Sequence, residues 1–197
     1  QINVLIDRWL ASFLAEGSIS YLYYANRLVQ FPHGILSLAV AAAAFPLLAD
    51  REARGRHGKE EGSARSPLDE AGRLTLFITL PAAFGLIALA RPIMEVLFER
   101  GAFVAADSSA SAAALRAYAL GLVFFGFVRL MAAAYHSRLD TKTPVRCANW
   151  AVLANVAGSV ALMFPLGFVG LALATTLASA LNAWLLLAGL RETEDWP

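Results

Sequence analysis

Four long apolar stretches constrain the fold of this chain more than any other feature. They occupy residues 74–90, 117–135, 150–166 and 168–190. As helices, stretches of this length come close to crossing the hydrocarbon core of a bilayer, which needs about 20 residues. Lipid offers no water to backbone polar groups, so only a helix satisfies them at these lengths. The sequence therefore predicts an all-α, polytopic transmembrane bundle.

Two further helices are expected before these stretches. Residues 21–49 predict a long span that Pro32 and Gly34 bend, and residues 15–20 predict a tight turn before it. Residues 1–14 read as the outer part of a helix whose beginning is missing, because the chain opens on Gln1 within an apolar segment. We therefore expect a piece of a longer protein. It has about six helices, the first partial, at residues 1–14, 21–49, 74–90, 117–135, 147–166 and 168–190.

The composition excludes several classes of function. Apolar residues make up 58% of the chain and charged residues 16%, whereas soluble domains carry about 25% charged residues. A net charge of +1 argues against nucleic acid as a partner. The sequence has no Cys/His cluster at metal-ligand spacing, no glycine-rich phosphate loop and no nucleophile with an evident His partner. We therefore do not expect an enzyme.

The loop charges predict an orientation in the membrane. Residues 50–73 and 136–146 are rich in Lys and Arg, and both loops fall on one side of the predicted bundle. The positive-inside rule makes that side cytoplasmic. On the other side, Glu95 and Glu99 lie near Arg91 and Arg100, a pattern that favours solvated ion pairs over an acid/base pair.

A cationic side chain inside an apolar helix is the first candidate site. On a helical period, Arg27 shares one face with Tyr23, Asn26 and Gln30. One interpretation is that the guanidinium reaches the outer interface, where Tyr21, Tyr23 and Tyr24 form an aromatic belt. The other is that it faces a polar cavity and binds an anionic head group through bidentate hydrogen bonds. Asn26 and Gln30 favour the cavity. Arg129 either lines that cavity or pairs toward the inner interface.

Asp7 is the only acid within an apolar run. It either pairs with Arg8 or caps a helix end, or it faces a pathway and holds a cation or a proton. In the last two helices, small polar residues recur at helical spacing. They are Asn155, Ser159, Thr175, Ser179 and Asn182. Such residues pack helix against helix, or together with Asp7 they form an all-oxygen site for a small hard cation such as Na⁺.

Several segments together resemble the MurJ/MviN family of lipid II flippases, within the multidrug/oligosaccharidyl-lipid/polysaccharide exporter superfamily. The segments are QINVLIDRWLASFL, SISYLYYANRLVQFPHGI, LFERGAF and LGFVGLALATTLASALNAWLL. Tyrosines followed by Ala-x-Arg-Leu and then Phe-Pro-x-Gly are more specific than a generic apolar pattern. The resemblance covers nearly the whole chain and corresponds to the second six-helix lobe of a two-lobe flippase, with the N-terminal lobe absent.

The resemblance implies a function that spacing alone does not supply. Members move the undecaprenyl-diphosphate-linked peptidoglycan precursor from the inner to the outer leaflet by alternating access. Arg27 matches the family's arginine at the mouth of the central cavity, which is expected to engage the diphosphate head group. Many relatives carry acids where Asn26 and Gln30 stand, and both positions are neutral here.

The resemblance also implies a cation site and a location. Asp7 matches an acid that binds Na⁺ in some members, Asn155 and Thr175 match its partners, and Leu171 would contribute its carbonyl. Ser159 stands where some relatives have an acid, so this site would carry less charge. The expected location is the bacterial cytoplasmic (inner) membrane, with membrane lipids, the lipid-linked precursor and the first lobe as partners. The alternatives are another exporter of the superfamily and a non-transporting membrane scaffold.

Overall fold

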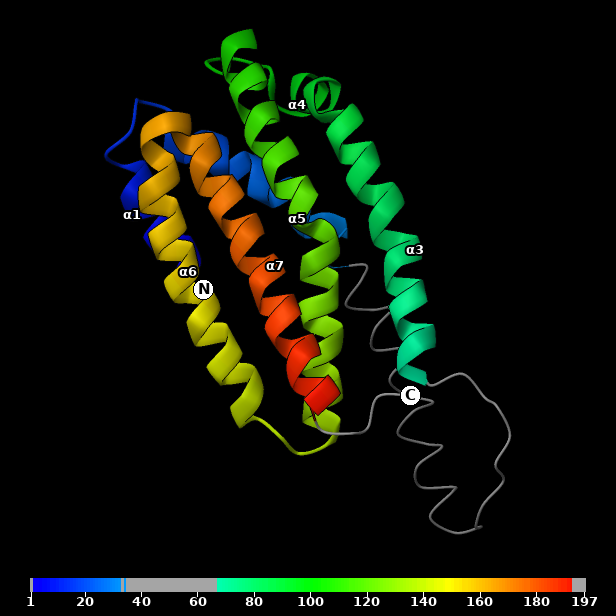
Figure 1. Cartoon of the computed structure of the whole chain (residues 1–197). Coiled ribbons are helices and arrows are strands. Elements are labelled where there is room, and N and C mark those ends of the chain that lie inside the picture. Colours follow the sequence, from blue (N-terminus) through cyan, green and yellow to red (C-terminus); the bar gives the residue numbers. More distant parts are fainter. Residues whose placement is uncertain (1, 33, 35–66, 193–197) are drawn as a thin grey trace, which may run out of the picture.

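Each long apolar stretch of the sequence is a helix in the structure. The computed structural model describes residues 2–32, 34 and 67–192, which form helices joined by short turns, with no strand among them (Figure 1). Residues 18–32 form a helix that we call the 18–32 helix. The others are α1 (Ile2–Ala11), α3 (Pro67–Ala88), α4 (Ala90–Phe98), α5 (Ala105–Ser137), α6 (Lys142–Leu166) and α7 (Phe168–Glu192). The predicted all-α class is confirmed.

Four of the helices in the described part of the chain are long and apolar enough to cross a membrane, namely α3, α5, α6 and α7. The predicted span at residues 21–49 and the predicted loop at residues 50–73 lie partly outside the described residues. Within α3, Pro81 is accommodated in the helix interior.

The helices pack side by side around α7. It lies against α5 and α6, while α3 lies against α5, and α1 contacts α6 and α7 (Figure 1). In this view the α6–α7 turn and α4 lie at the upper end. The α5–α6 turn, the start of α3 and the end of α7 lie at the lower end. The 18–32 helix crosses behind α7 and α5 near the upper end.

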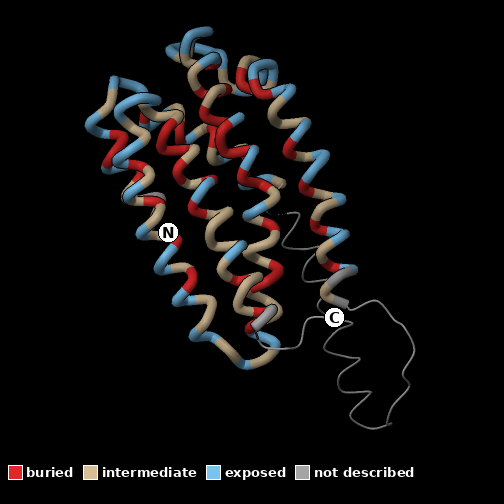
Figure 2. Tube along the Cα trace, in the orientation of Figure 1, coloured by how far each residue is buried: buried red, intermediate tan, exposed pale blue. Residues whose placement is uncertain are grey.

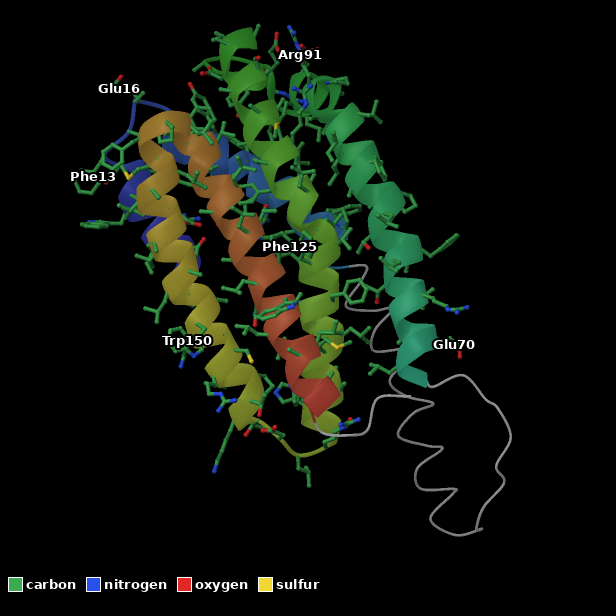
Figure 3. All side chains as sticks on the ribbon, in the orientation of Figure 1. Phe13, Glu16, Glu70, Arg91, Phe125 and Trp150 are labelled. Carbon is green, nitrogen blue, oxygen red and sulfur yellow. The ribbon has the colours of Figure 1, made fainter. Side chains whose placement is uncertain are left out.

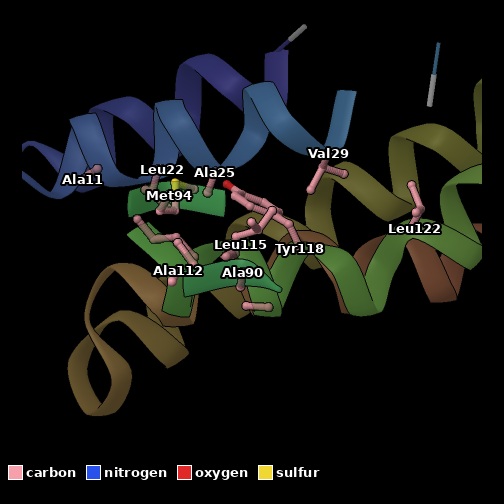
Figure 4. Close-up of a cluster of buried hydrophobic side chains, with 14 of the residues drawn as sticks. Ala11, Leu22, Ala25, Val29, Ala90, Met94, Ala112, Leu115, Tyr118 and Leu122 are labelled. Atoms are coloured by element: carbon pink, nitrogen blue, oxygen red, sulfur yellow. The ribbon is translucent and has the colours of Figure 1, made fainter. Parts of the chain in front are cut away.

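Two clusters of buried apolar side chains hold the bundle together. In the upper cluster, Leu22, Ala25 and Val29 of the 18–32 helix pack toward Met94 of α4 and Leu115 of α5 (Figure 4). The lower cluster joins α3, α5, α6 and α7 through Ala71, Leu130, Met131, Tyr135, Cys147, Leu186 and Leu190. The Tyr135 hydroxyl donates to the Leu186 carbonyl at 3.0 Å.

Large apolar side chains also cover the outside of the bundle. Buried residues gather where the helices face one another, and exposed residues line the outer sides of α3 and α6 (Figure 2). Phe13 and Trp150 point away from the bundle, with 66% and 61% of their surface exposed (Figure 3). A water-soluble bundle would bury such side chains, whereas acyl chains solvate them. The exposed apolar surface therefore fits a bundle surrounded by lipid.

Four helices begin earlier than predicted: α3, the 18–32 helix, α5 and α6, the last at Lys142 rather than residue 147. α3 starts at Pro67 rather than Leu74, because proline suits the first helical position and Glu70 is an exposed acid near the positive end of the helix dipole. The charged residues there indicated a loop, but they form helical turns beyond the apolar part. The 18–32 helix starts at Ser18 rather than Tyr21, and the Ser18 hydroxyl donates to the Ala15 carbonyl at 2.7 Å.

The largest difference concerns residues 91–114, which the sequence analysis left outside the predicted helices. They form α4, a short turn and the first turns of α5, which starts at Ala105 instead of residue 117. Asp107 stabilises this start by accepting the Val104 N–H at 2.9 Å. Ser108 and Ser111, which made the stretch look like a loop, are fully buried, and Ser108 donates to Glu99 at 2.8 Å. In these turns of α5, serines therefore occupy buried positions that apolar residues would fill in a purely apolar helix face.

The start of α6 has a polar cap. Asp140 accepts hydrogen bonds from the backbone N–H groups of Lys142 and Thr143 at 3.0 and 3.1 Å. The Thr143 hydroxyl also donates to Asp140. This bond and the two backbone hydrogen bonds hold the pKa of the Asp140 carboxyl below its ordinary value. The predicted loop at 136–146 is thus a turn of a few residues. α6 and α7 are joined by a turn at Gly167, whose φ is +56°.

We expect Gly170→Ala to lower the stability of the bundle. A Cβ at Gly170 would collide with the backbone carbonyl of Leu162, so α6 and α7 would have to separate next to their connecting turn. Overpacking of this kind costs about 1–3 kcal/mol. In detergent, the thermal unfolding midpoint of the variant should fall below that of the parent.

Gly85→Ala in α3 is the matched control for Gly170→Ala. Nothing lies within 4 Å of a Cβ built at Gly85, and alanine favours a helix interior by about 0.5–1 kcal/mol over glycine. Its unfolding midpoint should stay the same or rise. Equal midpoints for the two variants would contradict the close approach of α6 and α7.

Candidate functional site

The candidate cation site surrounds the buried carboxylate of Asp7. α1 places this side chain, 6% exposed, against α6 and α7. Oδ1 lies 3.4 Å from both Asn155 Nδ2 and Ser159 Oγ of α6. The Thr175 hydroxyl of α7 lies 3.0 Å from Oδ2 and 3.1 Å from the Leu171 carbonyl. The N-terminal helix α1 and the consecutive helices α6 and α7 thus bring together all five residues of the expected cation set.

Asn155 adds an oxygen that its surroundings do not satisfy. Its side chain is fully buried, and its Oδ1 has no hydrogen-bond partner among the described residues. A buried acceptor without a partner costs about 1–3 kcal/mol. With the carboxylate, two hydroxyls and a carbonyl nearby, the site is rich in the oxygen ligands that hard cations prefer. The one carboxylate supplies a single negative charge, which a monovalent cation balances.

A cavity of about 680 Å³ extends from Asp7 toward the lower end of the bundle. Asn26 and Gln30 line it from the 18–32 helix and Arg129 lines it from α5. α7 contributes Thr175, Ser179 and Asn182, which therefore face an open space. The polar residues of α7 thus form part of the cavity wall. The Oδ1 of Asn182 is buried and has no partner in the described part of the chain.

Arg27 does not line this cavity. It is exposed on the face of the 18–32 helix opposite to Leu22, Ala25 and Val29, which are buried. The predicted polar face is therefore divided. Asn26 and Gln30 border the cavity, whereas Arg27 and the half-exposed Tyr23 lie farther outward. No hydrogen bond or ion pair to Arg27 is seen among residues 2–32, 34 and 67–192, so nothing described there neutralises its charge.

Polar and aromatic contacts fix the upper end of the 18–32 helix. The Tyr21 hydroxyl donates to Asp107 Oδ1 of α5 at 2.7 Å, and its ring centroid lies 5.3 Å from that of Phe168. The Tyr24 ring lies 4.7 Å from Phe98 and 5.3 Å from Phe103. We call these six residues the upper clamp. The sequence had placed Tyr21 and Tyr24 in an interfacial belt, but of the three tyrosines only Tyr23 is exposed.

Sequence reasoning missed one residue of the site, Tyr118 of α5. Its side chain is 5% exposed and lines the cavity together with Asp7. It is one of two tyrosines in the apolar run of α5, and it gives no periodic or motif signal that would separate it from a core residue. Its position beside Asp7 depends on how α1 and α5 pack, which the sequence did not indicate.

The charged patch at the upper end is separate from the cavity. Arg91 Nε donates to Glu95 at 2.7 Å, as predicted, and Glu95 raises the pKa of the Arg91 guanidinium. Glu99 instead accepts from Ser108, and Arg100 donates to the carbonyls of Val96 and Leu97. These contacts satisfy helix ends and show no paired carboxylates for acid/base chemistry.

Comparison with known proteins identifies the family. The family model "Lipid II flippase MurJ" matches residues 1–195. A probable lipid II flippase MurJ of Haemophilus influenzae is 40% identical over 98% of this chain and 38% of its own length. That of Vibrio cholerae is 40% identical over 96% of this chain and 35% of its own length. The chain thus spans less than two fifths of the length of these relatives.

A solved structure agrees with the sequence matches. The structure described as "Lipid II flippase MurJ, inward closed conformation" superposes with a TM-score of 0.86 at 33% identity, covering 97% of this chain and 40% of that one. The predicted resemblance and the predicted membrane bundle are both confirmed. The chain belongs to the family of the lipid II flippase MurJ.

Proposed function

We propose that this chain is one lobe of a transporter that moves a lipid-linked peptidoglycan precursor from the inner to the outer leaflet. The observation that carries the proposal is a cavity into which Asn26, Gln30 and Arg129 face, inside a lipid-facing bundle of this family and bordered by the helix that bears Arg27. The undecaprenyl chain would stay in lipid while the head group crosses through polar space. No covalent chemistry is needed.

The charges suit a diphosphate head group. A guanidinium offers a planar fork of N–H donors that matches phosphate oxygens. Placing such a cation within lipid costs about 2.5–3.5 kcal/mol on insertion scales, so it is kept where an anion or water reaches it. Arg27 is exposed and Arg129 lines the cavity. Asn26 and Gln30 add neutral donors and acceptors suited to sugar and peptide groups.

The transport cycle requires a second lobe. This chain covers about two fifths of its relatives, and alternating access in such transporters arises when two lobes rock around a central site. Binding of the diphosphate would favour one arrangement of the lobes. The membrane potential or a cation gradient would bias the return.

The cation in this proposal is Na⁺ at Asp7. The supporting geometry is the buried carboxylate with Asn155, Ser159, Leu171 and Thr175 around it, and the unpartnered Asn155 oxygen. Because Ser159 is neutral, Na⁺ would balance the single charge of Asp7. Divalent cations would leave an excess positive charge in a buried site.

We place the lower end of the bundle in the cytoplasm and the protein in the bacterial inner membrane. Arg138, Lys142 and Arg146 lie in and beside the α5–α6 turn at that end. The positive-inside rule favours cytoplasmic loops at 50–73 and 136–146. Labelling of single cysteines introduced at exposed positions such as Leu139 and Val96 from either side of the membrane tests this orientation.

The experiment that tests transport is complementation. The test uses a bacterium that is depleted of its own lipid II flippase. The protein, in the form that its source organism produces, should restore growth and normal cell shape there. Accumulation of precursor in the inner leaflet should disappear at the same time. If growth fails although the protein reaches the membrane, the precursor is not its substrate. Export of another lipid-linked sugar would then indicate a different exporter of the superfamily, and no transport would indicate a scaffold.

A further inference from the structure

Two separate spaces meet at the Asp7 site. The 680 Å³ cavity lies on the lower side, and a pocket of about 30 Å³ lies on the upper side, lined also by Arg8, Ile19, Leu22 and Tyr23. Among the described residues, three line both spaces, namely Asp7, Asn26 and Tyr118. These three side chains therefore form the partition between the spaces, and the carboxylate is a part of it.

The turn of α5 that carries Tyr118 packs against α7. The hydroxyl of Thr176 in α7 donates to the carbonyl of Ala117, next to Tyr118, at 2.8 Å. One turn further along α5, Gly121 allows close approach, since a Cβ there would lie 2.8 Å from the Thr176 hydroxyl oxygen. Thr175, adjacent to Thr176, faces Asp7. One turn of α7 thus positions both a ligand of the expected cation set and the helix turn that carries Tyr118.

The two spaces give Asp7 unequal access. The upper pocket has about the volume that one water occupies in the liquid, whereas the lower cavity is many times larger. In this conformation the lower cavity has room for a hydrated cation beside the carboxylate, whereas the upper pocket does not. On the upper side, the Arg8 guanidinium lies 5.7 Å from the centre of the Tyr23 ring and adds a positive charge beside the narrow pocket.

We propose that Tyr118 is the gate of the cation site: its ring separates the lower cavity from the upper pocket beside Asp7, so that a cation that enters from the lower cavity cannot pass straight through. The proposal rests on the Na⁺ site proposed above and assigns to Tyr118 a role that is separate from ligation. The bulk of the ring performs it, with Asn26 closing the other side of the partition. Movement of the 18–32 helix would shift Asn26, so that the upper pocket would widen and the lower cavity would close.

Shortening Tyr118 should therefore join the two spaces. In proteoliposomes that contain the protein as expressed in its host, Tyr118→Ala should raise the efflux of radioactive Na⁺ several-fold above the parent, which should show little. Tyr118→Phe keeps the ring and should stay tight. Adding Asp7→Asn to Tyr118→Ala should remove the leak, because the path runs through the carboxylate. Should Tyr118→Ala fail to fold, Tyr118→Leu removes the ring while keeping an apolar side chain.

Phe125→Ala is the matched control. It removes an aromatic ring that lines the lower cavity but not the upper pocket, so it should not leak. Equal leaks from Phe125→Ala and Tyr118→Ala, or no leak from a folded Tyr118→Ala or Tyr118→Leu that still binds Na⁺, would overturn the gate. If the parent shows no Na⁺-dependent thermal shift, the cation site itself fails, and the gate fails with it. The binding measurement thus separates the two failures.

Discussion

Arg27→Ala should abolish growth of a flippase-depleted bacterium while the protein remains in the membrane at its normal level. The side chain is exposed and has no described contact within the bundle, so its removal should leave the fold intact. It should cost the diphosphate its hydrogen bonds, each worth about 1.5–3 kcal/mol when a partner is charged. Since each 1.4 kcal/mol is about tenfold, binding would weaken about ten- to hundredfold or more. Growth at a range of expression levels, with immunoblots of membranes, measures this effect.

Two further variants separate the head-group role from a charge at the interface. Arg27→Lys keeps the charge but loses the bidentate fork, so it should support growth poorly. Arg73→Ala removes an exposed arginine of α3 that does not line the cavity, and it should grow like the parent. Normal growth of Arg27→Ala, or full activity of Arg27→Lys, would support the alternative in which the guanidinium only reaches the membrane surface.

Asp7→Asn should remove the stabilisation of the protein by Na⁺. A ligand at 100 times its dissociation constant stabilises the folded state by about 2.7 kcal/mol. The parent should therefore show an unfolding midpoint several degrees higher in NaCl than in an equal concentration of choline chloride. The variant should show the same midpoint in both salts. The difference between salts is the quantity to compare, because removing a buried charge also changes the midpoint without Na⁺.

Asp107→Asn is the control for Asp7→Asn. It neutralises a carboxylate at the upper clamp, so it should lower the midpoint in both salts by weakening the contacts to Val104 and Tyr21. Its response to Na⁺ should equal that of the parent. A Na⁺ response that survives in Asp7→Asn would place the cation elsewhere, and no response in the parent would dismiss the cation.

The sequence allowed the all-α membrane fold to be predicted because lipid leaves few alternatives. Apolar stretches of this length identify α3, α5, α6 and α7 whatever their packing. The helix starts were wrong where polar residues belong to helices. Ser108 and Ser111 are buried against neighbouring segments, and Glu70 extends α3 beyond the apolar part. Hydropathy alone does not distinguish such helical turns from loops.

The site could be predicted only in part. Asp7, Asn155 and Thr175 come from three helices, and the family resemblance, not their spacing, grouped them before the structure placed them together. Helical spacing correctly put Asn26 and Gln30 on one side, but it did not separate them from Arg27. That separation depends on how the 18–32 helix is rotated against α5, and the position of Tyr118 depends on the same packing.

The upper clamp turns the 18–32 helix into a lever. Tyr21 and Tyr24 fix its N-terminal end against α4, α5 and α7, while Asn26 and Gln30, toward its other end, line the large cavity. At about 1.5 Å per residue, Gln30 lies about 13 Å beyond Tyr21, so a tilt of about 10° about the fixed end moves it by about 2 Å. Asn26 and Arg27 are neighbours on this arm. An anion that binds Arg27 and shifts this helix would therefore also displace the Asn26 amide, which lies beside Asp7. Anion binding at Arg27 and Na⁺ binding at Asp7 would thus be coupled through the 18–32 helix.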